Sequence, residues 1–125
     1  MSVTWGSFVE QLLAEVPEAE EVVSEHLSDN GELLIHLLMA DLLRFTVQAF
    51  HTGQSDVVMR TLDFMDKALL EGDEAVENAV AVSFVEHVEH VELGLGEGEA
   101  PAFLAMWPRG LLAEKARQDG WTPGG

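Results

Sequence analysis

A helical repeat of apolar side chains is the feature that most constrains how this chain can fold. The repeat is clearest in the segment Ser55–Leu70, where Asp56, Arg60 and Asp63 share one side at about 100° per residue. The opposite side is apolar and consists of Val57, Val58, Thr61, Leu62, Phe64, Met65, Ala68 and Leu69. Because no segment convincingly alternates apolar and polar residues as a half-buried strand does, the pattern predicts an all-α protein.

Glycine, proline and capping residues divide the repeat into five to six helices. The first expected segments are 4–15, a helix that begins at Pro17 and stops at 28–31, and a helix over 32–50 that Gly53 ends. They are followed by 55–70, 74–93 and a last segment from Pro101 that Pro108 breaks before 111–118. Long helices joined by short turns pack as antiparallel hairpins, either in a compact bundle or in a short HEAT-like stack. We therefore expect one α-helical domain over residues 1–119 and a frayed tail over 120–125.

Local signals predict the roles of two further residues and one loop. Asp73 is a favourable N-cap for the helix that begins at Glu74. Trp107, which precedes Pro108, is expected to close the core where the last helix docks. The glycine-rich segment 94–99 is expected to form a flexible loop.

The acidic charge of the chain is large and unevenly placed. There are 23 acidic and 6 basic residues, which gives a formal net charge of −17 at pH 7. No lysine or arginine precedes Arg44, and a second segment without either, 68–108, holds nine acidic residues. Such a surface repels nucleic acid and anionic membranes and attracts cationic partners. The alternative is that the acidity only keeps a small protein soluble.

Composition also excludes several classes of protein. With no cysteine, the chain has no disulfide, no thiolate nucleophile and no thiolate metal site. No apolar run approaches the roughly 18 residues that a membrane span needs. The N-terminus lacks the basic and apolar regions of a signal peptide, so we expect a cytoplasmic location.

A polar stripe interrupts the otherwise apolar segment 32–50. Asp41, Arg44, Gln48 and His51 follow one another at steps of three, four and three, which places them on one side of a helix. If the stripe is covered, its charges must be paired, and Asp41 is the natural partner of Arg44. If it is exposed, the stripe forms the wall of a groove that meets a partner. The sequence leaves both interpretations open.

Four histidine and glutamate side chains are candidates for a metal site. His87 and His90 lie one turn apart, and Glu32 and His36 are four residues apart, so two facing helices would bring these four side chains together. The chain has no HExxH motif, and structural histidines are the favoured interpretation. Ser83 and His87 are also four residues apart, but no oxyanion-hole motif accompanies them. We expect no cofactor and no enzymatic activity.

Three blocks of sequence resemble a known family. They are DNGELLIHLLMADLLRF at Asp29–Phe45, ENAVAVSFVEHV at Glu77–Val88 and FLAMWPRGLLAEKAR at Phe103–Arg117. In order and spacing they resemble a family of small, acidic, all-helical bacterial proteins of uncharacterised function, some of which look like immunity proteins for secreted toxins. The resemblance spans residues 8–118. It implies the helical fold and carries no catalytic residues to transfer.

These observations favour a binding protein, and we expect an immunity-type inhibitor that blocks a basic toxin or nuclease by binding to it. The expected contact residues are acidic: Glu15, Glu18, Glu20, Glu21 and Glu25, with the flank Glu86, Glu89 and Glu92. Two alternatives stay open. One is a metal-binding protein or metal-dependent hydrolase that uses Glu32, His36, His87 and His90. The other is a structural homodimer joined through the apolar sides of the segments 32–50 and 74–93.

Overall fold

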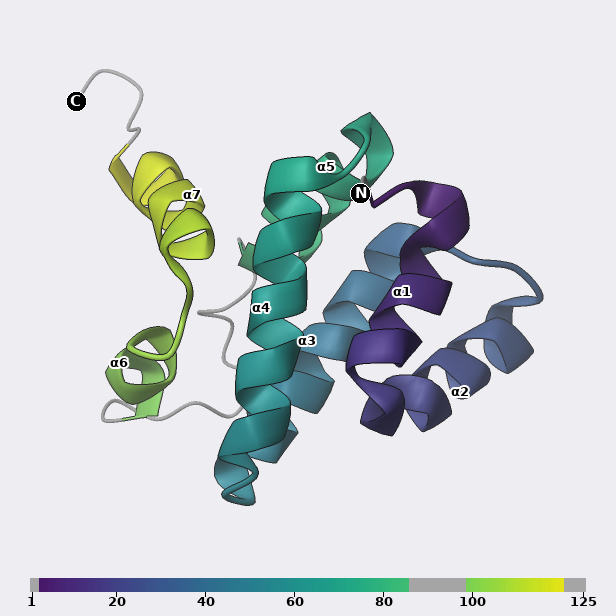
Figure 1. Ribbon diagram of the computed structural model, residues 1–125, viewed down its shortest axis with the longest axis horizontal. Coiled ribbons are helices and arrows are strands. Elements are labelled where there is room, and N and C mark those ends of the chain that lie inside the picture. Colours follow the sequence, from purple (N-terminus) through teal and green to yellow (C-terminus); the bar gives the residue numbers. More distant parts are fainter. Residues whose placement is uncertain (1–2, 86–98, 121–125) are drawn as a thin grey trace.

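The computed structural model describes residues 3–85 and 99–120, and within these ranges the protein is built from helices (Figure 1). The elements in chain order are the 3-10 helix η1 Trp5–Ser7, α1 Phe8–Glu15, the 3-10 helix η2 Pro17–Ala19, α2 Glu20–Asn30, α3 Ile35–His51, α4 Ser55–Glu71, α5 Glu74–Val80, the π-helix η3 Ala81–Val85, α6 Glu99–Leu104 and α7 Arg109–Gly120. The described residues contain one isolated β-bridge and no strand. The predicted all-α fold is confirmed.

Helices α3 and α4 form the central hairpin, with α1 and α2 on one side and α6 and α7 on the other (Figure 1). Leu42 of α3 and Leu62 of α4 are fully buried, as expected for helices that are covered on more than one side. The ring of Phe8 in α1 meets the ring of Phe64 in α4 edge to face, with centroids 5.4 Å apart. The elements therefore share one continuous core.

Two glycines end helices as the sequence predicts. Gly31 has a φ of 72° and follows α2, and Gly53 has a φ of 77° and follows α3. This left-handed conformation is strained for residues with a Cβ atom, which explains why glycine ends both helices.

The N-terminal residues hold the turn between α4 and α5. The amide of Val3 donates a hydrogen bond to the carbonyl of Glu71 at 3.1 Å, and the amide of Asp73 donates to the carbonyl of Val3 at 3.0 Å. Asp73 also caps α5, because its carboxylate accepts a hydrogen bond from the amide of Val76 at 2.9 Å. The predicted N-cap is confirmed.

Several boundaries differ from the sequence expectations. Helix α3 begins at Ile35 rather than at residue 32, because Leu34 has an extended backbone and serves as the N-cap. The first expected helix is split, since residues 5–7 form a 3-10 turn before α1. In the segment 74–93, the α-helix gives way to a π-helix at Ala81. The rest of that segment, the expected loop at 94–98 and the tail residues 121–125 lie outside the described residues.

The last helices dock through Trp107, as predicted. This side chain is buried, and its ring lies 6.1 Å from that of Phe84 and 6.0 Å from that of Phe103, centroid to centroid. The amide of Leu111, near the start of α7, donates to the carboxylate of Asp66 in α4 at 3.0 Å. Among the described helices, none is both long and apolar enough to cross a membrane.

Candidate functional site

A groove between α2 and α3 brings together two sets of residues that the sequence singled out separately. It has a volume of about 430 Å³. Glu25 enters it from the acidic run of α2, and Asp41, Arg44 and Gln48 enter it from the polar stripe of α3. The remaining lining residues are Val22, His26, Asp29 and Phe45. We call this feature the α2/α3 groove.

The polar stripe is a partly exposed groove wall rather than a buried network. Arg44 donates a hydrogen bond to Asp41, so the predicted pair is confirmed. The side chain of Asp41 is 33% exposed and that of Arg44 is 56% exposed. His51 does not line the groove and instead lies 3.1 Å from Glu99 of α6, measured from Nε2 to Oε2. Three of the four stripe residues therefore line one groove, and the fourth, His51, contacts α6.

His26 is a groove residue that the sequence analysis missed. Its side chain is fully buried, and its Nε2 atom accepts a hydrogen bond from the amide of Leu34 at 3.0 Å. Nδ1 lies 3.7 Å from the Oδ2 atom of Asp41. The sequence indicates the burial of His26, because His26 lies on the same helix face as Val22 and Val23. It does not indicate the bond to Leu34, eight positions away, because that bond depends on the turn at Gly31.

One member of the acidic run, Glu18, is already paired. Both of its carboxylate oxygens accept hydrogen bonds from Arg60 of α4, at 2.9 and 2.6 Å. These bonds lower the pKa of Glu18 from 4.5 to about 2, and they raise the pKa of Arg60. Arg60 also donates to Asp56 and to the backbone carbonyl of Glu15. Glu18 thus joins η2 to α4.

The other carboxylates of the run remain exposed to solvent. Glu20, Glu21 and Glu25 all lie on α2, and no basic side chain of the described residues forms an ion pair with them. Glu15 is also exposed, at the end of α1. The predicted flank of Glu86, Glu89 and Glu92 lies outside the described residues.

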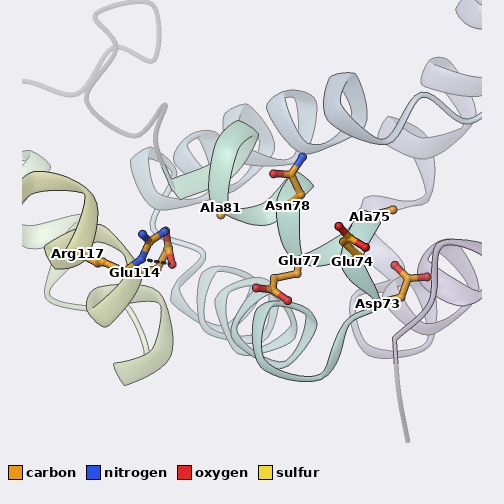
Figure 2. A pocket seen from close by; sticks show the side chains of 8 residues that line it. All are labelled: Asp73, Glu74, Ala75, Glu77, Asn78, Ala81, Glu114 and Arg117. Carbon is orange, nitrogen blue, oxygen red and sulfur yellow. Dashed lines mark hydrogen bonds and ion pairs between the residues drawn. The ribbon is translucent and has the colours of Figure 1, made fainter. Parts of the chain in front are cut away.

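A second and larger cleft, of about 860 Å³, lies between α5 and α7 (Figure 2). Asp73, Glu74 and Glu77 line it from the start of α5, and Glu114 and Arg117 line it from α7. Burial raises the pKa of Glu114, but hydrogen bonds from Arg117 and Gln118 more than offset this effect, and the net change is a lower pKa. Like the α2/α3 groove, this cleft is acidic with a single arginine.

The metal candidates do not form a site among the described residues. Glu32 lies in the linker before α3, so the expected pair on one helix is wrong. His36 does face the π-helix η3, where its Nδ1 atom lies 2.8 Å from the hydroxyl of Ser83. His87 and His90 lie outside the described residues. No group of three or more potential ligands comes together in the part of the chain that the structure describes.

Comparison with known proteins identifies a family. A family model described as "Domain of unknown function (DUF7674)" matches residues 9–122, and the chain belongs to this family. The resemblance to a family of uncharacterised function is therefore confirmed. No curated protein and no solved structure matches the chain significantly.

Proposed function

We propose that this protein binds a basic protein partner through α2 and the α2/α3 groove. The observation that carries the proposal is the set of exposed carboxylates on α2, Glu20, Glu21 and Glu25, which no basic side chain among the described residues neutralises. Unpaired carboxylates on one helix attract a cationic surface and orient it during encounter.

The α2/α3 groove offers a hollow in which a side chain of the partner can be desolvated, which a flat acidic surface does not. It is hollowed, and its lining combines carboxylates with the apolar side chains of Val22 and Phe45. A partner's arginine or lysine stem would contact these apolar groups while its charged end meets Glu25 or Asp41. Anchors of this kind, desolvated in a pocket, contribute most of the affinity of protein interfaces.

An immunity-type inhibitor is the specific form of this proposal. Such a protein would block a basic toxin, for example a nuclease, by covering its active cleft. Acidic side chains would then take the place of the nucleic-acid phosphates, which also carry negative charge. Inhibition by occupancy needs no catalytic residues in the inhibitor.

The test is affinity capture from cells of the native host, with wild type compared with two charge variants. The first variant carries Glu20→Gln, Glu21→Gln and Glu25→Gln. The matched control removes the same charge elsewhere, with Asp63→Gln, Glu74→Gln and Glu77→Gln. We expect wild type and the control to capture the same basic protein, identified by mass spectrometry, and the α2 variant to lose it.

Salt dependence provides a second readout. Because exposed charges are screened beyond a Debye length of about 8 Å at physiological ionic strength, capture should weaken as salt rises. Recovery of no basic protein at low salt, or equal loss from both variants, would contradict binding through α2. An inhibition assay of the captured partner then separates an immunity protein from a binding protein of another kind.

A further inference from the structure

The buried imidazole of His26 joins the end of α2 to the start of α3. Its side chain has no exposed area, and its Nε2 atom accepts the amide hydrogen of Leu34, the N-cap residue of α3. The side chain of the N-cap residue itself makes no capping hydrogen bond. His26 instead accepts the amide hydrogen of Leu34, one of the amides at a helix start that have no partner within the helix. The bond spans the turn at Gly31 and positions the linker between the two helices.

The geometry of this bond defines the protonation state of the ring. An imidazole nitrogen that accepts a hydrogen bond carries no proton, so the proton of the neutral ring lies on Nδ1. On the Nδ1 side, the acceptor is Oδ2 of Asp41, at 3.7 Å; Nδ2 of Asn30, at 3.4 Å, is a donor and bonds the backbone carbonyl of His26 at 2.8 Å. A second proton, on Nε2, would face the amide hydrogen of Leu34 at a separation of 3.0 Å between the nitrogens. Two donors cannot form a hydrogen bond, so the protonated ring must release Leu34.

We propose that His26 is a proton-operated latch that holds the α2–α3 linker closed when neutral and releases it when protonated. Histidine is the side chain that ordinarily changes charge between about pH 5 and pH 8. The consequence for the α2/α3 groove is direct, because His26 lines it. The latch rests only on the hydrogen-bond geometry; its effect on partner binding rests on the proposed function.

The charged groups around His26 determine the direction of its effect on the groove. Asp41 and Arg44 face it from α3, and Glu25 and Asp29 line the same groove from α2. In η2, which also packs on α2, Glu18 is held by Arg60. The groove therefore holds three carboxylates and one guanidinium, and protonation of His26 would add a second positive charge to it. Protonation weakens the attraction for a basic partner at the same time as it frees Leu34.

Nuclear magnetic resonance of the labelled protein tests the latch directly. The imidazole ¹⁵N signals of His26 report its tautomer and protonation, and the amide signal of Leu34 reports its hydrogen bond. As the pH is lowered, we expect a neutral ring protonated on Nδ1 to become an imidazolium. The Leu34 amide signal, together with its protection from hydrogen exchange, should change with the same midpoint.

Three variants isolate the cause. His26→Gln offers an oxygen acceptor near the position of Nε2 without a titrating group, so the Leu34 transition should disappear. Asp41→Asn removes the carboxylate that favours the imidazolium, so the transition should move to lower pH. His51→Gln removes an imidazole that lies outside the groove and should leave the transition unchanged. A Leu34 transition that persists in His26→Gln, or a ring that becomes protonated while Leu34 keeps its bond, would overturn the latch.

Binding of an oligo-arginine peptide, followed by fluorescence anisotropy, tests the functional consequence. On acidification, the affinity of the wild type should fall more than that of His26→Gln. An equal fall in both proteins would overturn the regulatory role while the latch itself stands. If the triple glutamine variant of α2 binds the peptide as wild type does, the proposed binding surface fails, and the resonance experiment is unaffected.

Discussion

The contact between Phe8 of α1 and Phe64 of α4 should contribute a coupling free energy to stability, in addition to what the burial of each ring contributes on its own. Both rings are buried, with centroids 5.4 Å apart and planes at 63°, so the edge of one meets the face of the other. Such aromatic pairs contribute about 0.5–1.5 kcal/mol beyond the burial of their area. For a chain of this size, a total stability of roughly 6–19 kcal/mol is typical. The pair is therefore a measurable part of the whole.

A double-mutant cycle measures the coupling free energy between the two rings. Phe8→Leu, Phe64→Leu and the double variant are unfolded in urea, with helical circular dichroism as the signal, and each free energy of unfolding is extrapolated to water. We expect the double variant to be less destabilised than the sum of the single variants by about 0.5–1.5 kcal/mol. A control cycle of Phe8→Leu with Phe103→Leu should be additive, since Phe103 pairs with other rings. Additivity within about 0.3 kcal/mol for Phe8 and Phe64 would refute the reasoning.

Three further substitutions test local features of the fold. Gly72→Ala should lower the free energy of unfolding by about 1–3 kcal/mol in urea denaturation, because the new Cβ would clash with the backbone carbonyl oxygen of Ala68. Asp73→Ala should cost about 0.5–2 kcal/mol in the same assay, because it removes the cap of α5. Glu18→Gln should lower the melting temperature most at neutral pH. The bond to Arg60 lowers the pKa of Glu18 from 4.5 to about 2, so its stabilising effect is complete above 4.5 and is lost as pH falls through about 2. A difference in melting temperature that persists at the lowest pH would contradict this assignment.

The partner-binding residues could be anticipated in part. The acidic run was visible in the sequence because no lysine or arginine precedes Arg44. That Glu18 is held by Arg60 could not be anticipated, since the two are 42 positions apart and meet only when η2 packs beside α4. The structure therefore separates one structural carboxylate from the exposed ones of α2.

The start of α3 could likewise be predicted only in part from the sequence. Residue 32 was a reasonable start for α3, because the segment from Glu32 onward is uninterrupted by proline or glycine. At the actual start, Ile35, the amide of the extended N-cap residue Leu34 donates a hydrogen bond to His26 of α2. Local propensity is a weak guide where a distant side chain supplies the hydrogen bond.

The sequence by itself determined the helical class, the helix ends at Gly31 and Gly53, the cap at Asp73 and the burial of Trp107. These features depend on local backbone geometry and on apolar periodicity, which are properties of neighbouring residues. Tertiary structure alone decided that Glu25 and Asp41 share one groove, with Nδ1 of His26 lying 3.7 Å from Oδ2 of Asp41. Such contacts depend on how helices pack, and packing joins residues that no sequence spacing relates.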